Sequence, residues 1–463
     1  MPSIEGLAPR RSALRMLDAV LRRGQTLESA AAQDRGLSAA DHGLAVAIAG
    51  ETLRWLPDLD ALIDGATRQR LPDDSKARMV LRLALAQKIG LGTPDHALVA
   101  TALPLIDGGP RRLVHGVLGT LLRRGLPAGE APHLPADVEK RWRKAWGEEV
   151  VQAARRLIAA RPPLDLSFAE DMEAQVYARS NGGISLASRH VRIESAAVTE
   201  LPGYHTGHWW VQDLAASLPA RLIPPAAEEV LDLCAAPGGK TMQMAAAGHR
   251  VTAVDSSKSR LGRLRENLDR TRLKAQLVEA DALEWRPDRE FDAILLDAPC
   301  SATGTFRRHP EVLYRARPKI IAENAILQSQ LLARAVEWLK PGGALVYSVC
   351  SLEPQEGEEV IEQFLASCPT FKLDEIEASP LVGEVGGARP ASAGQENQKS
   401  RLSAEQSAGS DRSAPPLNPP HEGEGLPESV QPIERGFIRI LPSTLAAQGG
   451  LDGFFMARLV RRG

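Results

Sequence analysis

Cysteine is scarce in this chain of 463 residues. The four cysteines, Cys234, Cys300, Cys350 and Cys368, are too few and too scattered for a disulfide framework. No Cys-x-x-Cys pair occurs, so the sequence predicts no zinc site and no other metal centre. We therefore expect a protein of the reducing cytoplasm.

Long hydrophobic runs and a strong net charge are also missing. No run of about 18 apolar residues occurs, and the N-terminal stretch has no apolar region before a small-residue cleavage site. We expect neither a membrane span nor secretion. The formal net charge of -2 excludes a uniformly basic coat for nucleic acid, but it leaves room for a local basic face. The length favours two or three domains.

Residues 1–128 have the spacing of amphipathic helices. Apolar residues recur every three or four positions in segments such as "SALRMLDAVLRR" and "ARMVLRLALAQKIGL", which predicts an all-helical domain. The capping signals are Ser38, Asp73 and Thr93 at helix starts and Gly24, Gly90 and Gly125 at helix ends. Lys and Arg exceed Asp and Glu by 17 to 13 over residues 1–125, which fits either a binding face or an ordinary surface.

Residues 129–225 are predicted to be a linker and RNA-recognition extension. The segment "KRWRKAW" interleaves basic side chains with Trp142 and Trp146, as suits phosphates and unstacked bases. Two tryptophans four residues apart are, however, more often a packing stripe on a helix. Further on, Gln212 and Asp213 are expected to cap a helix.

Residues 226–463 alternate short β-rich runs with helical stretches. Five such runs between residues 228 and 351 predict a doubly wound, mostly parallel α/β sheet. Two more, within residues 436–443 and 452–462, predict a closing antiparallel hairpin and bring the sheet to seven strands. Residues 380–432 are rich in Pro, Ser, Gly, Glu and Gln without an aromatic residue, so we expect a disordered insertion there.

The first β-rich run leads into a glycine turn. In "EVLDLCAAPGGKT" (229–241), Gly238 and Gly239 allow the backbone to approach a ligand, and the N-terminus of the following helix favours negative groups. The segment is neither a Gly-x-Gly-x-x-Gly fingerprint nor a P-loop. A glycine turn could also simply join a strand to a helix.

Acidic residues end the next three runs, at Asp255, Asp281 and Asp297. Because the carboxyl ends of parallel strands meet at one edge of the sheet, all three acids are expected to face the ligand crevice. Asp255 lies at the distance from the glycine turn at which an acid binds ribose hydroxyls. An isolated acid there could instead form an Asx-turn.

Two cysteines leave strand ends at the same edge. Cys300 follows the fourth run in "LLDAPC", and Cys350 follows the fifth in "LVYSVC". Two thiols above a nucleoside site suggest nucleophilic chemistry on a substrate. Cys368 is interpreted as a small buried residue.

The segments "LDLCAAPGGKT", "DAPCSATGTFRRHPE" and "YSVCS" resemble the signature blocks of the Sun family of RNA cytosine-5 methyltransferases. The resemblance spans roughly residues 130–380 and 433–462, and the helical part before it resembles a NusB-like RNA-binding domain. It implies a Rossmann-like methyltransferase fold over residues 226–463. It also implies transfer of methyl from S-adenosylmethionine to carbon 5 of a cytosine in RNA, with ribosomal RNA as the expected partner. We expect a monomer.

The resemblance also implies roles for single residues. The loop for the methionine part of the cofactor comprises Cys234, Ala235, Ala236, Pro237, Gly238, Gly239 and Lys240. Asp255 would bind the ribose and Asp281 the adenine. Asp297 would contact the edge of the cytosine and is grouped with Lys240 as catalytic. Cys350 would be the nucleophile and Cys300 the helper in product release.

One position departs from the family pattern, because Val349 stands where the family usually has Thr before the nucleophile. The thiol is kept, but a hydroxyl that could tune the site is lost. Separately, Arg307, Arg308 and His309 directly follow the cysteine segment and are expected to hold the RNA backbone.

Two other functions compete with this interpretation. In a DNA cytosine-5 methyltransferase the thiol after proline, Cys300, would attack, but the chain lacks the Glu-Asn-Val motif of that class. A non-catalytic RNA-binding assembly factor could keep the same fold, but it would not need Cys300, Cys350 and the complete glycine loop. Amino-directed methyltransferases are disfavoured because "DAPC" lacks a stacking aromatic residue.

Overall fold

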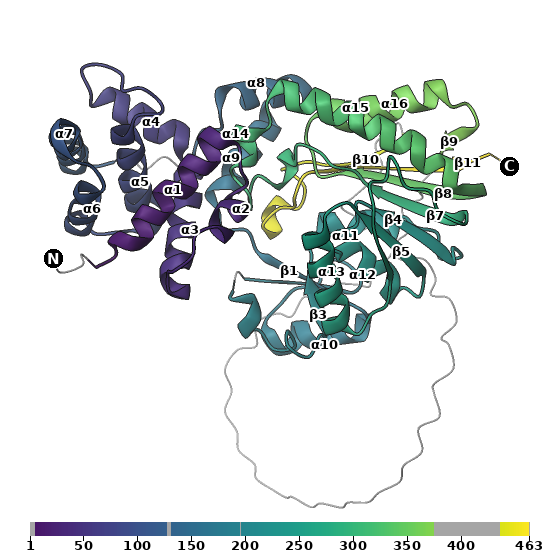
Figure 1. Ribbon diagram of the computed structural model, residues 1–463. Helices are drawn as coiled ribbons and strands as arrows, with labels where there is room; N and C mark the ends of the chain where they lie inside the picture. The colour runs from purple at the N-terminus through teal and green to yellow at the C-terminus, as the bar shows by residue number, and fades with distance from the viewer. Residues whose placement is uncertain (1–4, 127–130, 195, 375–435, 463) are drawn as a thin grey trace, which may run out of the picture.

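The N-terminal third of the protein is a bundle of helices that is separate from the sheets (Figure 1). The computed structural model describes residues 5–126, 131–194, 196–374 and 436–462. The insertion predicted at 380–432 therefore lies outside the described residues. The helices of the bundle are α1 (Leu7–Arg23), α2 (Leu27–Ala32), α3 (Ala39–Arg54), α4 (Leu56–Gly65), α5 (Lys76–Leu91), α6 (Asp95–Ala102), η1 (Leu103–Leu105) and α7 (Gly108–Arg124).

Helix α5 is the centre of this bundle, because every residue from 77 to 87 is buried. Its buried Arg78 is paired with Asp60 at 2.9 Å and with Asp64, so the charge is compensated inside the bundle. The Ser38 cap is confirmed by its bond from the Asp41 amide. Two expected boundaries move by two residues, since α5 is capped by Ser75 rather than Asp73 and ends at Gly92 rather than Gly90. The next helix has Pro94 rather than Thr93 at its N-cap.

A small antiparallel sheet follows, which the sequence pattern did not predict. The elements of this region are α8 (Ala136–Trp146), α9 (Glu148–Ala159), β1 (Leu164–Phe168), α10 (Asp171–Asn181), β2 (His190–Ile193), η2 (Val198–Glu200) and β3 (Trp209–Val211). The strand order is β2-β1-β3, with α10 packed on β1 and β2. The strands are short and separated by long connections, so no sustained alternation marks them in the sequence.

The large sheet has the predicted doubly wound form, with eight described strands rather than seven. They are β4 (Glu229–Leu233), β5 (Arg250–Asp255), β6 (Gln276–Glu279), β7 (Phe291–Asp297), β8 (Leu339–Val349), β9 (Phe371–Leu373), β10 (Ile438–Ile440) and β11 (Phe454–Arg461). The order is β10-β11-β8-β7-β4-β5-β6, and β9 pairs with β11. Strands β8, β7, β4, β5 and β6 are parallel, and β10 and β11 form the predicted antiparallel hairpin.

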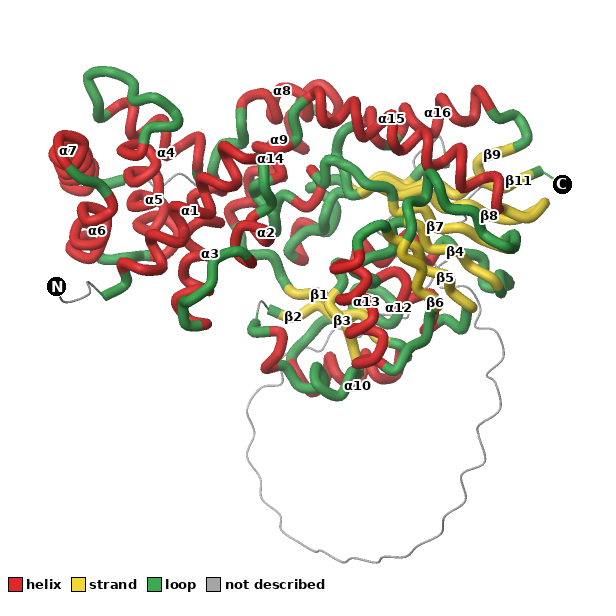
Figure 2. The backbone as a smooth tube through the Cα atoms, viewed as in Figure 1, coloured by secondary structure: helices red, strands yellow, loops and turns green. Residues whose placement is uncertain are grey.

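Helices cover both faces of this sheet (Figures 1 and 2). The covering elements are α11 (Leu214–Arg221), α12 (Gly239–Ala246), α13 (Lys258–Thr271), η3 (Thr303–Thr305), α14 (Val312–Arg315), α15 (Pro318–Ala335), η4 (Val336–Trp338), η5 (Pro354–Glu356), α16 (Glu358–Ser367) and η6 (Ala446–Gln448). Along β7, Ile294 and Leu296 are buried in one core cluster, whereas Ala293 and Leu295 are buried in the other. Burial of both faces explains why these strands are almost continuously apolar.

The helical bundle docks on the segment that follows Cys300. The amide of Leu27 donates to Glu311 at 3.2 Å, and the hydroxyl of Tyr314 donates to the Leu53 carbonyl at 2.8 Å. The guanidinium of Arg54 donates to the Arg307 carbonyl at 2.8 Å. The bundle is thus fixed directly to a loop of the large-sheet unit.

The tryptophans of "KRWRKAW" are packing residues. Trp142 is fully buried, its ring meets Phe306 edge to face at 5.4 Å, and its indole donates to Glu353 at 3.1 Å. The indole of Trp146 donates to the Leu352 carbonyl at 2.8 Å. The alternative in which both rings stack on RNA bases is therefore wrong for this pair.

We expect Trp142→Ala to lower the free energy of unfolding by about 3–5 kcal/mol, because it opens a cavity and leaves Glu353 without its indole donor. The midpoint of urea unfolding, followed by circular dichroism, measures this loss. Lys144→Ala on the exposed side of the same helix is the control and should shift the midpoint little. Equal midpoints for the two variants would contradict the packing role.

Candidate active site at the strand ends

The glycine turn after β4 forms the first wall of the site. Cys234 and Gly238 both have positive φ, 59° and 104°, and α12 begins at Gly239. A Cβ on Gly238 would lie 2.0 Å from a methyl carbon of Leu264, so only glycine fits there. The N-terminus of α12 has no side-chain cap. Its first backbone amides can therefore bind a carboxylate.

The acids at the ends of β5 and β6 differ in their surroundings. Asp255 is buried and accepts bonds from the amides of Ala236, at 3.1 Å, and Ser257, at 2.9 Å. It therefore ties the glycine turn to the end of β5 and still has lone pairs for ribose hydroxyls. Asp281 is exposed and accepts from the Leu283 amide at 2.9 Å, which is an Asx-turn. Both acids thus accept from the amide two residues further on, but only Asp255 is buried and also holds the glycine turn.

Asp297 at the end of β7 is held by two partners. The ammonium of Lys240 lies 2.8 Å from one carboxylate oxygen, and the hydroxyl of Ser348 donates to the other at 2.8 Å. Lys240 also lies over the ring of Phe454, 5.2 Å from its centroid. The pair joins the cofactor turn to the strand that leads to Cys300, which the sequence spacing alone could not predict.

A second buried acid, Asp232, was missed because it lies inside a strand rather than at its end. It is fully buried below the turn, and burial raises its pKa to about 7. One of its oxygens accepts from the hydroxyl of Thr241 at 2.5 Å, whereas the other has no hydrogen-bond partner among the described residues. An orphaned oxygen beside the turn indicates space for a polar ligand.

The two cysteines meet at the edge where β7 and β8 end. The Sγ atoms of Cys300 and Cys350 lie 3.5 Å apart. The hydrogen bond to Cys350 and burial raise the pKa of Cys300 well above its usual value. Burial likewise raises the pKa of Cys234 to about 12. Cys300 and Cys234 are therefore neutral thiols at pH 7.

The expectation that Arg307 holds the RNA backbone is wrong. Its side chain is 1% exposed and donates to Asp452, at 2.9 Å, and to Asp213. All its donors are thus directed inward. Asp213 also accepts from the Ala215 amide at 2.9 Å and caps α11, as predicted.

Arg308 and His309 lie nearer the surface. Arg308 is one-third exposed and pairs with the other oxygen of Asp452. His309 is 45% exposed, and its ring lies 3.9 Å from Glu311. These two positions, unlike Arg307, can reach a ligand.

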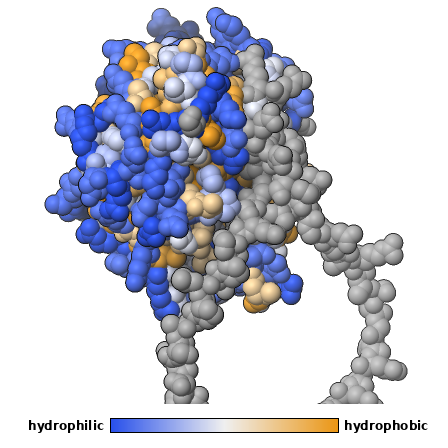
Figure 3. Space-filling view, turned by 90° about the vertical axis from the view of Figure 1, so that its right-hand side faces the viewer, coloured by the Kyte–Doolittle hydropathy of each residue, from blue (hydrophilic) through white to orange (hydrophobic). Residues whose placement is uncertain are grey.

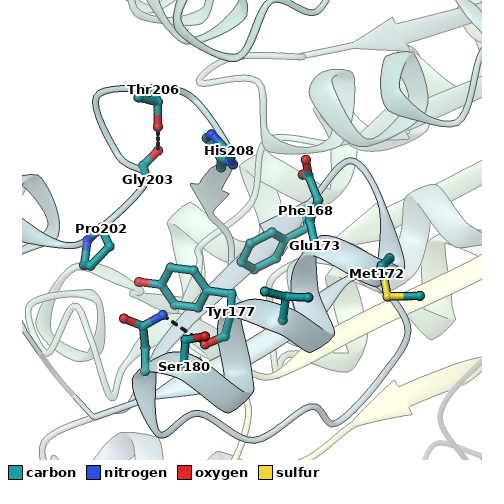
Figure 4. A pocket seen from close by; sticks show the side chains of 11 residues that line it. Phe168, Met172, Glu173, Tyr177, Ser180, Pro202, Gly203, Thr206 and His208 are labelled. Atoms are coloured by element: carbon teal, nitrogen blue, oxygen red, sulfur yellow. Dashed lines mark hydrogen bonds between the residues drawn. The ribbon is translucent and has the colours of Figure 1, made fainter. Parts of the chain in front are cut away.

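A separate pocket of about 490 Å³ lies on the small sheet (Figure 4). Its lining includes Phe168, Met172, Val176, Tyr177 and His208, from β1, α10 and the loop before β3. It contains none of the site residues that the sequence predicted. The chemistry is therefore expected at the strand ends and not in this pocket.

The residues at the strand ends fit S-adenosylmethionine. A cradle for a polar group is formed by Gly238, where an added Cβ would clash with Leu264, by the uncapped start of α12 and by the unpaired oxygen of Asp232. Asp255 adds acceptors suited to ribose. Among the described residues, no cluster of three or more His, Cys, Asp or Glu could hold a metal ion. None of the described helices has the length and apolar composition needed to cross a bilayer.

This fold and this cradle define a methyltransferase that uses S-adenosylmethionine. The profile of the family described as "16S rRNA methyltransferase RsmB/F" matches residues 219–460, and that of the NusB family matches residues 7–123. The chain belongs to the 16S rRNA methyltransferase RsmB/F family. It is thus an rRNA methyltransferase with an N-terminal NusB domain.

Individual relatives agree. "Ribosomal RNA small subunit methyltransferase B" of Pseudomonas putida is 36% identical over 78% of this chain and 89% of its own length. The protein of the same name from Erwinia tasmaniensis is 34% identical over 76% and 89%. A crystallised methyltransferase homologue from Pyrococcus horikoshii is 26% identical, with a TM-score of 0.51 over 74% of this chain and 98% of that chain.

We expect Gly238→Ala to weaken binding of S-adenosylmethionine at least about tenfold, because the added Cβ displaces Leu264 and the left-handed backbone disfavours alanine. Isothermal titration calorimetry measures the affinity. Gly248→Ala is a matched control, since Gly248 has a similar φ of 95° but nothing within 4 Å of the added carbon. Equal affinities for the two variants would show that the close approach at Gly238 is irrelevant to the cofactor.

Proposed function

We propose that this protein methylates carbon 5 of a cytosine in 16S ribosomal RNA through a covalent bond between Cys350 and carbon 6 of the base. The observation that carries the proposal is the pair of sulfur atoms 3.5 Å apart at the ligand edge of the sheet. They lie beyond the ends of β7 and β8, and Asp297, which ends β7, is paired with Lys240 of α12.

Covalent attack activates a carbon that is otherwise a poor nucleophile. The Cys350 thiolate forms a bond to carbon 6, and the electron pair of the 5,6 double bond moves onto carbon 5. The base becomes an enamine, so carbon 5 can attack an electrophile. S-adenosylmethionine, when bound, supplies that electrophile as its sulfonium methyl group. Asp297, held by Lys240 and Ser348, is suited to bind the amino edge of the cytosine and fix the ring.

The two thiols then have different tasks. Once carbon 5 carries the methyl group, loss of its proton to a base restores the double bond and expels Cys350 as a thiolate. Cys300 stays protonated at neutral pH, and its thiol lies 3.5 Å from the sulfur of Cys350, so it can donate a hydrogen bond to the thiolate as that leaves. Thiols whose surroundings differ in this way are suited to different steps.

Arg308 provides a positive charge close to the attacking sulfur. Burial lowers the pKa of Arg308, but the carboxylates of Asp452 and Asp213 and the charge of Cys350 raise it by more. The pKa of Arg308 is therefore above its usual value. Arg308 is therefore always charged and lies within electrostatic range of Cys350. A neighbouring positive charge favours the nucleophilic form of a thiol. We assign Arg308 to the support of the thiol, with His309 left as the residue of this segment that contacts RNA.

Cys350→Ala should reduce methylation of an rRNA fragment at least about 1000-fold, because no other thiol can attack. Cys300→Ala should still attack but stall before release. It should therefore accumulate a protein–RNA adduct that survives denaturing electrophoresis. Incorporation of labelled methyl groups and the gel together measure both outcomes. Accumulation of the adduct in Cys350→Ala instead would reverse the two assignments.

Helix α7 of the NusB domain is a candidate RNA contact. Its 17 residues include four arginines and one histidine but no acidic residue. Arg111, Arg112 and His115 are exposed, whereas Val114 and Leu118 of the same helix are buried. In the described part of the chain these three basic side chains have no acidic partner. Phosphates supply the charge that such a face lacks.

We expect Arg111→Ala/Arg112→Ala to weaken binding of a 16S rRNA fragment roughly tenfold at about 0.1 M salt, and to lower the salt slope of the affinity by about 2. Filter binding across a salt series measures both quantities. The control is Arg22→Ala/Arg23→Ala in the same domain, where the arginines are already paired with Asp18. An unchanged slope in the α7 variant would exclude this face as an RNA contact.

The remaining assignments complete the proposal. We assign residues 1–128 to the RNA-binding domain, 129–225 to a linking region that includes the small sheet, and 226–463 to the catalytic domain. We expect the protein to act as a monomer in the cytoplasm. On the coloured part of the face drawn in Figure 3, hydrophilic residues predominate and hydrophobic ones are scattered. This part of the surface therefore offers no large apolar patch to a second copy, which supports a monomer.

A further inference from the structure

A buried glutamate joins the two segments that carry the catalytic thiols. Glu356 lies at the end of η5 and is fully buried. One carboxylate oxygen accepts from the amide of Ser301 at 2.7 Å and from the side chain of Asn324 at 2.9 Å. The other accepts from the hydroxyls of Ser301 and Ser351.

Two of the residues that donate to Glu356 are the neighbours of the two cysteines in the sequence. Ser301 directly follows Cys300, and Ser351 directly follows Cys350. One carboxylate therefore holds the residues next to both sulfurs, which are otherwise 50 positions apart in the chain. The two hydroxyls also lie 3.2 Å from each other, so the three side chains form one closed network.

Glu356 is itself fixed. Its carbonyl accepts from the buried hydroxyl of Tyr347 at 2.6 Å, and Asn324 fixes its side chain to α15. Burial raises the pKa of Glu356 above its usual value, although the hydrogen bonds from Ser301, Ser351 and Asn324 oppose this shift. A buried acid is costly unless every oxygen is bonded, and here both oxygens are.

We propose that Glu356 is a positioning residue, and that the reach of its side chain sets the distance between the sulfurs of Cys300 and Cys350. The catalytic consequence rests on the proposed function, because only that reaction uses both sulfurs. The geometric consequence does not rest on it. Without Glu356 the two segments keep the β7–β8 ladder and the contacts of Thr303 and Gly304 with the Cys350 segment, but they lose the carboxylate that holds Ser301 to Ser351.

Glutamine and aspartate separate reach from charge. Glu356→Gln keeps the length of the side chain, and the serine hydroxyls can rotate to accept from its amide. Glu356→Asp keeps the charge but is shorter by one carbon–carbon bond, roughly 1.5 Å, so it cannot reach both segments. If Glu356 positions the thiols by its length, Glu356→Gln must change the approach of the two sulfurs less than Glu356→Asp does.

The first readout is the rate at which diamide oxidises the two thiols to a Cys300–Cys350 disulfide, in the full chain without RNA or cofactor. Each thiol loses a proton and an electron, the sulfur–sulfur bond forms, and diamide takes up both hydrogens. We expect Glu356→Gln to react within about threefold of the wild-type rate and Glu356→Asp at least about tenfold more slowly, because the reaction depends on proximity. Peptide mass mapping identifies the bond.

Glu353→Asp is the matched control. Glu353 is also buried and lies three residues earlier, but its carboxylate binds Trp142 and Arg141 rather than Ser301 or Ser351. It should lower stability without slowing the disulfide. Ser351→Ala is a milder variant that keeps Glu356 and removes the hydroxyl through which it holds the Cys350 segment, together with the contacts of that hydroxyl to Ser301 and Thr303, so it tests the proposal even if Glu356→Asp does not fold. It should also slow the disulfide.

The second readout is steady-state methylation over a range of RNA concentrations. Glu356→Asp should lower kcat about tenfold or more with little change in KM, and Glu356→Gln should retain most of kcat. Wild-type disulfide rates in Glu356→Asp and Ser351→Ala would overturn the proposal, as would a Gln variant as slow as the Asp variant. Failure of the proposed function would instead show as full activity in Cys350→Ala, with the disulfide rates unaffected.

Discussion

The parallel pairing of β7 with β8 is the constraint on which the site depends. In this register Asp297 lies opposite Ser348, so the chain leaves both strands at the same level. Cys300 follows three residues after Asp297 and Cys350 two residues after Ser348, and their sulfurs come within 3.5 Å. A shift of one residue would turn one thiol away from the other, because side chains alternate between the two faces of a strand. The ladder fixes the level of the thiols, and Glu356 fixes their approach beyond it.

Charge at the site is organised by buried pairs rather than by exposed side chains. Asp452, just before the second strand of the C-terminal hairpin, binds both Arg307 and Arg308, and Arg307 also binds Asp213, the N-cap of α11. Arg307 therefore connects three parts of the molecule that are distant in sequence. Arg308, bound through the same carboxylate, is left with its charge near Cys350. Of the two arginines expected to hold RNA, Arg307 therefore stabilises the fold, and we assign Arg308 to the support of the Cys350 thiol.

The geometry also weighs against the competing functions. A scaffold that only binds RNA has no need for two thiols 3.5 Å apart with a buried network behind them. The Asx-turn at Asp281 shows that one strand-end acid has a local role. Asp255 and Asp297, by contrast, each bind a residue of the glycine turn and so couple the cofactor cradle to the thiol edge.

The sequence by itself determined the order of helices and strands, the glycine turn, and the acids and cysteines at the strand ends. These features are local: apolar periodicity and a positive φ at glycine depend on neighbouring residues only. It also placed the acids and thiols at one edge, since parallel strands share a direction. The tertiary structure alone decided that Arg307 is buried, that Trp142 packs, that β1–β3 form a second sheet and that Glu356 spans both cysteine segments. Those outcomes depend on partners as many as 211 residues away, as for Trp142 and Glu353, and no local pattern encodes which distant group will satisfy a buried polar side chain.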